Sequence, residues 1–314
     1  MTAAPRAVLI TGAGGFVGRH LAAALAGRQA RVISTGFPDG GDDDEPMDVT
    51  SAASVRATLD RVRPAAIVHL AGITAKATAD RDPDRAWDVN VNGTVNVAEA
   101  ILDLVPKCRL IFVSSSEVYG RSFASGLPLA ETAPLSPMTT YARTKAAAEE
   151  RITTLCGRGL RATRLRPFNH FGPGQRPDFA IASFANQIAR IEAGLQAPEL
   201  HVGDLSSARD FLDVRDVVAA YLAVLDGFDT LPTNSVFNVA SGVATPVQAI
   251  LDMLLGMARR PIRVVADAAR MRVDEVPVAR GDASALTRAA GWKPVRALAD
   301  SLRDTLDFFR SAAA

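Results

Sequence analysis

Ala7-Val-Leu-Ile-Thr-Gly-Ala-Gly-Gly-Phe-Val-Gly18 is the stretch from which the fold can be predicted. Its first part, Ala7 to Thr11, is a continuous apolar run, which is typical of a buried strand. The alanine-rich residues that follow, Arg19 to Gly27, predict a helix. A strand, a glycine turn and a helix in this order indicate an α/β fold with a parallel sheet.

The glycines of the turn are spaced Gly12-x-x-Gly15-x-x-Gly18, with one more residue between the first two than in the usual dinucleotide fingerprint. Glycine lets the backbone approach a pyrophosphate, and the N-terminus of the next helix offers amide donors and a favourable dipole. Glycine turns also occur for structural reasons alone. Because this turn joins a strand to a helix, we expect it to bind a dinucleotide cofactor.

The residues expected near the adenosine half of that cofactor do not separate NAD from NADP. A NAD site often has an acid at the end of the second strand, about 20 residues after the glycines. Here the predicted strand Arg31 to Thr35 ends in Ser34-Thr-Gly36, with no acid and no adjacent arginine. Asp48, just before a predicted helix from Ala52 to Arg63, either meets the adenine amino group or belongs to a helix N-cap region.

The composition is that of an ordinary globular protein, with 314 residues, 48% hydrophobic residues and a net charge of +1. This balance does not indicate nucleic-acid or membrane-surface binding. No apolar run reaches the roughly 20 residues that a membrane span needs. Cys108 and Cys156 form no metal-binding motif, so we expect no metal, and reduced thiols in the cytoplasm.

Small and polar residues follow the next predicted strand and lie in the next long helix. The strand from Ala65 to Leu70 contains His69, which we expect to be a packed core histidine, and ends in Ala71-Gly72, which would let a cofactor lie close. A long helix is predicted from Asp84 to Val105. Its Asn90 either organises the backbone around the site or is a capping or packing asparagine.

Tyr141-Ala-Arg-Thr-Lys145 places a tyrosine and a lysine on one face of a helix predicted from Pro137 to Leu155. A phenol beside an ammonium can be tuned for proton transfer near neutral pH. Only four of the 35 basic residues are lysines, so this lysine stands out. A flexible point charge suits a ribose hydroxyl and a phenol better than an arginine fork does. The alternative is an incidental pair on a surface helix.

Three hydroxyls and a carboxylate lie in the segment that follows a further predicted strand, Arg109 to Ser114. Ser115-Ser-Glu117 lies at its carboxyl end, where open α/β sheets bind their ligands. These side chains are candidates for the chemistry of the site. Serines that cap a backbone turn are the alternative.

The ordered set of motifs resembles the extended short-chain dehydrogenase/reductases that act on nucleotide sugars. The motifs are GAGGFVG, HLAG, NVNGT, VSSSEVYG, YARTK and Arg166-Pro-Phe-Asn169, within a likeness that runs from Ala7 to about Leu306. The resemblance implies a Rossmann fold, which is a doubly wound parallel sheet, with a smaller C-terminal α/β lobe. We expect a NAD(P)-binding domain over residues 1–168 and a substrate lobe mainly over 169–314, with returns to the Rossmann core around 210–240.

The resemblance also implies roles for single residues. Ser115 is the expected catalytic hydroxyl and Tyr141 the acid/base, while Lys145 is expected to hold the nicotinamide ribose and to lower the pKa of the tyrosine. The cofactor is NAD or NADP. The expected cofactor contacts are Gly12, Gly15, Phe16, Val17, Gly18, Asp48, Val49, Leu70, Ala71, Gly72, Asn90, Tyr141, Lys145 and Pro167.

On the substrate side, Asn169 is expected to hold a substrate phosphate or the backbone, and Ser116 to contact the substrate. Arg209 suits a diphosphate, because its planar fork matches phosphate oxygens; the alternative is a salt bridge to a neighbouring aspartate, Asp210 or Asp213. Arg272 and Glu275 match a second family arginine near the diphosphate and an acid near the nucleotide ribose. Val273 replaces the usual proline after that arginine.

The block Phe168-Asn-His-Phe-Gly-Pro-Gly-Gln175, with the residues after it, resembles GDP-6-deoxy-4-keto-mannose reductases. This likeness implies NAD(P)H-dependent reduction of the C4 ketone of a GDP-4-keto-6-deoxy-hexose to GDP-rhamnose. A 4-epimerase is an alternative, and so is a 4,6-dehydratase that uses Glu117. A non-catalytic redox sensor would have lost Tyr141 or Lys145, and both are present.

The resemblance further implies a homodimer built on a four-helix bundle. Two helices of each chain, those with Asn90 and Tyr141, would pair with their counterparts. The alanines that would allow close packing are Ala98, Ala100, Ala146, Ala147 and Ala148. The same alanines are equally suited to packing inside one chain.

Overall fold

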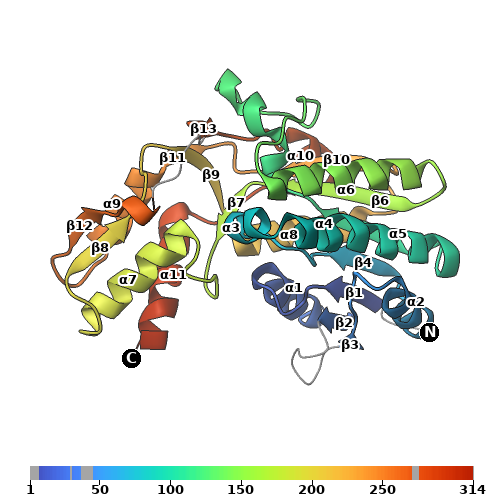
Figure 1. Ribbon diagram of the computed structural model, residues 1–314, viewed down its shortest axis with the longest axis horizontal. Coiled ribbons are helices and arrows are strands. Elements are labelled where there is room, and N and C mark those ends of the chain that lie inside the picture. The colour runs from blue at the N-terminus through green and yellow to red at the C-terminus, as the bar shows by residue number, and fades with distance from the viewer. Residues whose placement is uncertain (1–6, 29, 37–44, 271–275, 314) are drawn as a thin grey trace.

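The computed structural model describes residues 7–28, 30–36, 45–270 and 276–313. Within them, a central sheet of seven parallel strands has the order β3-β2-β1-β4-β5-β6-β10 (Figure 1). The strands are β1 (Ala7–Thr11), β2 (Arg31–Gly36), β3 (Glu45–Pro46), β4 (Ala66–His69), β5 (Arg109–Val113), β6 (Arg161–Pro167) and β10 (Ser235–Val239). The chain moves outward from β1 to β3 and then crosses back to β4, so the predicted doubly wound fold is confirmed.

Helices cover both faces of this sheet. The helices on the two faces, with the short segments beside them, are α1 (Phe16–Ala26), α2 (Ala52–Val62), α3 (Lys76–Arg81), α4 (Pro83–Trp87), α5 (Gly93–Leu104), α6 (Thr140–Cys156), α8 (Val214–Gly227) and α10 (Ser284–Ala290). Successive residues of a strand point to opposite faces, so Val8 and Ile10 pack with α1 and α8 while Leu9 packs with α2 and α5. Burial on both faces explains why these strands are continuously apolar.

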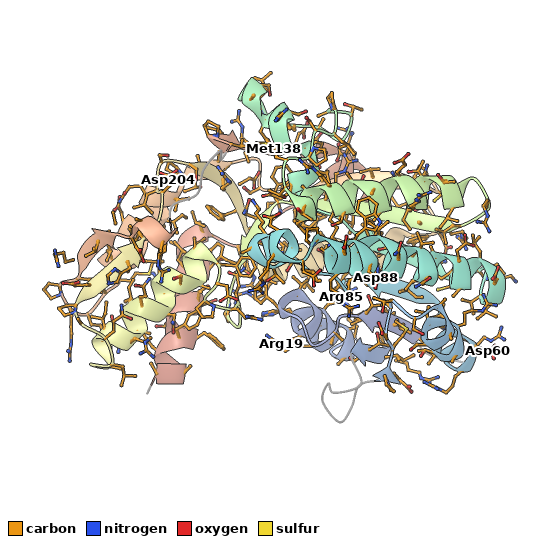
Figure 2. The ribbon with its side chains drawn as sticks, viewed as in Figure 1. Arg19, Asp60, Arg85, Asp88, Met138 and Asp204 are labelled. Carbon is orange, nitrogen blue, oxygen red and sulfur yellow. The ribbon has the colours of Figure 1, made fainter. Side chains whose placement is uncertain are left out.

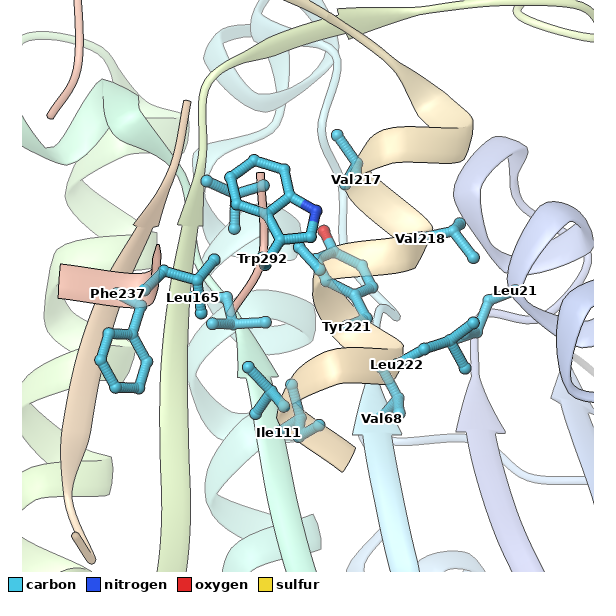
Figure 3. Close-up of a cluster of buried hydrophobic side chains, with 14 of the residues drawn as sticks. Leu21, Val68, Ile111, Leu165, Val217, Val218, Tyr221, Leu222, Phe237 and Trp292 are labelled. Carbon is cyan, nitrogen blue, oxygen red and sulfur yellow. The ribbon is translucent and has the colours of Figure 1, made fainter. Parts of the chain in front are cut away.

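The core on the α1 and α8 side is formed by residues far apart in the sequence. Figure 3 shows Val68 and Ile111 from the sheet beneath Tyr221 and Leu222 of α8, with Trp292 beside them. The indole of Trp292 donates a 3.0 Å hydrogen bond to the carbonyl oxygen of Asp216 in α8. The segment around Trp292 is thereby attached to α8 beside the central sheet, a return that the sequence did not indicate.

A second group of elements forms a smaller lobe with its own hydrophobic core (Figure 1). It contains α7 (Ala180–Glu192), α9 (Val247–Gly256), α11 (Leu298–Ala313), β7 (Asn169–Phe171), β8 (Glu199–Val202), β9 (Ala208–Asp213), β11 (Ala244–Pro246), β12 (Arg263–Ala266), η3 (Ala268–Arg270) and β13 (Val278–Ala279). Strand β9 pairs with β7, β11 and β13, and β8 pairs with β12. In the part of the chain that is described, no helix is long and apolar enough to cross a membrane.

A buried carboxylate joins the lobe to the central sheet. Asp210 of β9 accepts hydrogen bonds from the backbone amides of Ser241, Gly242 and Gly281, at 2.8 to 3.2 Å. Burial raises the pKa of Asp210, and the hydrogen bonds that it accepts lower it. Because a buried carboxylate needs such partners, this contact fixes the turn after β10 against β9.

The long helix predicted from Asp84 to Val105 is instead three segments. A π-helical turn, η1 (Asp88–Asn92), separates α4 from α5. Such turns are rare and occur often at functional sites. The serine-rich segment after β5 forms a 3-10 helix, η2 (Ser116–Ser125), interrupted at Gly120, whose φ of 46° favours glycine.

Candidate active site

The predicted site residues converge at the carboxyl ends of β1, β4 and β5. Strand order reverses between β1 and β4, which is where doubly wound sheets leave a crevice for ligands. The turn after β1 carries the glycines, the turn after β4 carries Ala71 and Gly72, and Ser115 follows β5. Helix α6 brings Tyr141 and Lys145 to the same region through its contact with η2.

The glycine turn is required first by the packing of the chain itself. Gly12 has a φ of 69°, and a Cβ added there would lie 2.9 Å from the backbone nitrogen of Ala71. A Cβ at Gly18 would overlap the carbonyl oxygen of Gly12. These two glycines therefore let α1 and the end of β4 approach the turn closely.

The same turn fits the pyrophosphate of a dinucleotide. Gly15 is the N-cap of α1, makes no side-chain cap hydrogen bond, and no acidic residue follows in the first turn. The first amides of α1 thus lack a side-chain partner at a helix end that favours anions. No heavy atom lies within 4 Å of a Cβ added at Gly14, so the turn is open beside these amides.

A chain of buried hydrogen bonds fixes the ends of β1 and β4. The Thr11 hydroxyl accepts from the backbone amides of Leu70 and Ala71, both at 3.1 Å, and therefore donates to His69 Nδ1 at 2.7 Å. His69 Nε2 then donates to the Thr94 hydroxyl at 3.1 Å. Burial, and to a smaller extent the charge of Lys145, lowers the pKa of His69 to about 3. His69 is thus the neutral core histidine that the sequence predicted.

Asn90, which was expected to contact the cofactor, holds the backbone beside it. Its Oδ1 accepts from the amide of Ile73 at 2.8 Å, and its Nδ2 donates to the Ile73 carbonyl and to the Thr144 hydroxyl. Both amide protons are therefore used within the protein. A Cβ added at Gly72 would lie 2.9 Å from Asn90 Oδ1, so Gly72 leaves room for this side chain.

The phenol of Tyr141 is placed beside Ser115. Thr139 caps α6 and thereby fixes Tyr141 in its first turn. Burial raises the pKa of Tyr141 to about 12; hydrogen bonding from the Ser115 side chain lowers it, and the charge of Glu117 raises it. Tyr141 is therefore protonated at neutral pH and can act as a proton donor.

Lys145 is 3% exposed and is fixed to β5, the strand that precedes the serines. Its Nζ donates a 2.8 Å hydrogen bond to the carbonyl oxygen of Val113 and lies 5.1 Å from the centre of the Phe112 ring. Burial lowers the pKa of Lys145 to about 8, and the charge of Glu149 raises it. In this structure burial raises the pKa of Tyr141, and the expected lowering of that pKa by Lys145 stays a prediction.

Glu117 forms an ion pair that the sequence did not reveal. Its Oε2 lies 2.9 Å from Nζ of Lys76, the first residue of α3, and both side chains are about one third exposed (34% and 30%). The backbone amide of Glu117 donates to the Ser115 hydroxyl at 3.2 Å. The scarcity of lysine that marked Lys145 also marks Lys76 and was the available signal.

The remaining predicted cofactor contacts lie at the edges of this region. Asp48 Oδ1 accepts from the amide and the hydroxyl of Thr50, at 2.9 and 2.8 Å, so this oxygen stabilises the turn before α2. Val49 is buried and its carbonyl accepts from Asn96, which attaches it to α5. Leu70 packs at the end of β4, and Pro167 is buried at the end of β6.

The predicted substrate residues that are described lie on three elements. Ser116 is buried in η2, and Asn169 begins β7, directly after the buried β6. Arg209 in β9 donates to the Ala208 carbonyl at 2.9 Å, next to strand β13. Its two alternative partners are engaged elsewhere, Asp210 as above and Asp213 by the guanidinium of Arg215. Arg272 and Glu275 lie outside the described residues.

The substrate-side loop after β7 rests on the first turns of α1. The rings of Phe16 and His170 are stacked, with centroids 6.3 Å apart. His20 Nε2 lies 2.9 Å from the carbonyl oxygen of Pro173. Arg19 donates to the carbonyl oxygens of Gly14 and Gly174 and lies on the side of α1 that faces the lobe (Figure 2). One side chain therefore contacts both the glycine turn and the substrate-side loop.

A family model described as the NAD dependent epimerase/dehydratase family matches residues 8–240. The chain belongs to this family. The match covers the glycine turn, the Ser115 segment, and the helix with Tyr141 and Lys145. The predicted family is therefore confirmed.

Two curated relatives match this family member over nearly their whole length. A GDP-6-deoxy-D-mannose reductase from Pseudomonas aeruginosa is 38% identical over 309 residues, which cover 97% of each chain. A GDP-6-deoxy-D-talose 4-dehydrogenase from Aggregatibacter actinomycetemcomitans is 28% identical over 94% of this chain and 96% of its own. Neither match leaves a large part of either protein unaccounted for.

A solved structure has the same fold and holds a cofactor. RMD from Pseudomonas aeruginosa, complexed with NADPH, matches 98% of both chains with 36% identity and a TM-score of 0.87. Together with the family, this structure confirms two predictions, an enzyme and a nicotinamide dinucleotide, NAD or NADP, as its cofactor. Among the described residues no group of three or more metal-ligating side chains lies together.

Proposed function

We propose that the protein reduces the C4 ketone of GDP-4-keto-6-deoxy-D-mannose with NADPH or NADH, giving GDP-6-deoxy-D-mannose, also called GDP-D-rhamnose. The observation that carries this proposal is the 38% identity to a GDP-6-deoxy-D-mannose reductase across 97% of both chains. The convergence of Ser115, Tyr141 and Lys145 at the switch point of the sheet supports it, because reduction of a ketone needs a proton donor beside the carbonyl oxygen.

In this proposal the chain holds the cofactor and moves one proton. The amides at the start of α1 would bind the pyrophosphate, and the cationic Lys145 would bind the nicotinamide ribose. When bound, the reduced nicotinamide supplies the two electrons and the hydrogen that the ketone carbon takes up. Tyr141 donates its proton to the ketone oxygen, and the Ser115 hydroxyl orients that oxygen by hydrogen bonding.

The lobe would bind the rest of the substrate. Arg209 and Asn169 are proposed contacts of the diphosphate, and Ser116 of the sugar; Arg272 and Glu275 stay predictions for the diphosphate and the nucleotide ribose. The loop that rests on Phe16 and Arg19 lies between the glycine turn and these residues, so it is placed to hold the ketone against the cofactor. We also propose that residues 1–168 form the cofactor-binding part and residues 169–314 mainly the substrate-binding part, because most of the proposed cofactor and substrate contacts divide in this way.

The experiment is to incubate the protein with GDP-4-keto-6-deoxy-D-mannose and NADPH or NADH, following the nicotinamide absorbance and identifying the sugar. We expect the absorbance to fall and a 6-deoxyhexose to form with the manno configuration at C4. In Tyr141→Phe, turnover should fall roughly 100-fold or more while cofactor binding persists. No oxidation of the cofactor, with GDP-mannose dehydrated or a sugar epimerised instead, would reject the reductase.

A product with the talo configuration is the second candidate. A GDP-6-deoxy-D-talose 4-dehydrogenase is 28% identical over 94% of this chain, and the two product sugars differ only in their configuration at C4. The face of the ketone that meets the nicotinamide decides between them. The coupling constants of H4 in the product sugar distinguish the two outcomes.

We further propose a cytoplasmic homodimer that pairs through α5 and α6. A cavity of about 670 Å³ on the outer side of α6 is lined by Trp87, Leu135, Ala146 and Ala147 among others, and Trp87 is 45% exposed. The other alanines proposed for this contact, Ala98, Ala100 and Ala148, are buried within one chain. Of the five alanines that the sequence suggested for the interface, only Ala146 and Ala147 line this cavity. Free thiols at Cys108 and Cys156 agree with a cytoplasmic location.

A further inference from the structure

The ion pair of Lys76 and Glu117 calls for a reason other than stability. Both side chains are about one third exposed, 34% and 30%, and such pairs contribute roughly 0–1 kcal/mol to folding. Lys76 is also the first residue of α3, where a positive charge opposes the helix dipole. Neither the free energy of folding nor the local helix therefore explains a lysine at this position.

The position of the pair is set by the catalytic elements. Glu117 follows Ser115 in η2, and its charge is close enough to raise the pKa of Tyr141. On the other side, Asp80 of α3 accepts a 3.3 Å hydrogen bond from the backbone amide of Thr140, next to Tyr141. Helix α6, which carries the proton donor Tyr141, thus holds α3, and α3 in turn places Lys76 beside Glu117.

A carboxylate at this place is a hazard for a ketone substrate. The hydrogens at C3 and C5 of a 4-keto sugar flank the carbonyl carbon and are acidic. A free carboxylate could take one of them, and the electrons of the broken C–H bond would form a double bond to C4. The ketone oxygen would then take the Tyr141 proton, giving an enol. Return of a proton from water at the same carbon exchanges or inverts it, with no net oxidation.

We propose that Lys76 is a specificity-determining positioning residue, which binds the Glu117 carboxylate and so keeps it from enolising the ketone. Nζ of Lys76 lies 2.9 Å from Oε2 of Glu117, and its positive charge balances that of the carboxylate. A carboxylate held in this way accepts hydrogen bonds from hydroxyl groups of the sugar, while the ammonium beside it donates them. It does not take a carbon-bound proton. This inference rests on the proposed function, since it requires a 4-keto sugar in the site.

The test measures solvent exchange at carbon instead of reduction. Each protein is incubated with GDP-4-keto-6-deoxy-D-mannose and oxidised NADP in D₂O, and deuterium at C3 and C5 is followed by NMR. We expect slow exchange with the natural chain and exchange at least roughly tenfold faster with Lys76→Met. Lys76→Arg should restore slow exchange, and the double variant Lys76→Met, Glu117→Gln should be slow again. Lys107→Met, at an exposed lysine in the loop before β5, is the matched control.

Three outcomes would overturn the inference. Exchange in Lys76→Met that equals the natural chain would show that Lys76 does not restrain a base. Fast exchange that persists in the double variant would assign it to another group. Lack of cofactor oxidation by the natural chain with this substrate and NADPH would reject the proposed function, and the inference with it. Melting curves of each variant identify a loss of folding, which would also lower the rate of ketone reduction. Faster deuterium exchange, by contrast, requires an active base in a folded protein.

Discussion

Nζ of Lys145 lies 2.8 Å from the carbonyl oxygen of Val113, the last residue of β5. A Cβ added at Gly72, after β4, would lie only 3.6 Å from the same nitrogen. The ammonium is therefore enclosed between the ends of two strands, one of which leads into Ser115. This enclosure explains why a small, flexible cation is present where most basic residues of the chain are arginines.

Lys145→Arg should fail although the charge is kept. The planar guanidinium is larger than an ammonium and does not fit between Val113 and Gly72 without moving them. We expect the kcat/KM for ketone reduction to fall roughly 100-fold or more, measured by cofactor oxidation. Lys293→Arg, at an exposed lysine, is the matched control and should leave kcat/KM unchanged. Full activity of Lys145→Arg would show that the enclosure has no functional meaning.

The pH dependence of reduction should report the charge of Lys145. Burial lowers its pKa to about 8, so Lys145 is cationic below that pH and neutral above it, while Tyr141 keeps its proton up to about 12. We expect kcat/KM to decline above about pH 8 with the slope of a single ionisation. The decline should be absent in Lys145→Met, whose residual rate is measured over the same range. An unchanged decline in that variant would assign it to another group.

Gly12 and Gly14 should respond differently to alanine. Gly12 has a φ of 69° and would place its Cβ 2.9 Å from the Ala71 nitrogen, whereas a Cβ at Gly14 has no heavy atom within 4 Å. Gly12→Ala should lower the free energy of unfolding by about 1–3 kcal/mol, and Gly14→Ala by under about 0.5 kcal/mol. Chemical denaturation without cofactor measures both. Equal losses in the two variants would contradict the packing described for the turn.

His69 should make the protein less stable in acid. Its pKa is about 3 in the folded protein against an ordinary 6.5, so the unfolded chain binds the extra proton between these values. The stability that His69 contributes is complete above about pH 6.5 and is lost as the pH falls toward 3, at up to roughly 1 kcal/mol per pH unit.

The measurement is urea denaturation between about pH 5 and pH 7. The stability of His69→Gln should change less steeply with pH, although its stability at neutral pH is lower because Thr11 and Thr94 lose a partner. Equal slopes for the two proteins would show that other groups cause the loss in acid.

The proposed dimer can be tested at Ala147. A glutamate there would put a much larger side chain into the cavity that Trp87 and Leu135 line, and the added volume would keep two copies from packing closely. Light scattering after size-exclusion chromatography should give the mass of a dimer for the natural chain and of a monomer for Ala147→Glu. Ala57→Glu, on the exposed side of α2, should stay a dimer. A monomeric natural chain would reject the proposal.

The sequence indicated the fold and the candidate site residues because both predictions rest on local chemistry. The apolar run before Gly12 and the spacing of Gly12, Gly15 and Gly18 predict strand, turn and helix without reference to the rest of the chain. The spacing of Tyr141 and Lys145 places them on one helix face for the same reason. The resemblance to the family was carried by the order of six motifs along the chain, from the glycine turn to Arg166-Pro-Phe-Asn169.

The tertiary structure alone decided which groups face one another. Asn90 holds the backbone because η1 turns it toward Ile73, and the ammonium of Lys145 donates to the carbonyl oxygen of Val113. Lys76 and Glu117 are far apart in the sequence and meet only because β4 and β5 are neighbours in the sheet. Sequence periodicity specifies which face of an element a side chain occupies, whereas the pairing of strands determines what lies opposite it. That is why the sequence could place the candidate reactive groups on their elements but could not name the groups that face them.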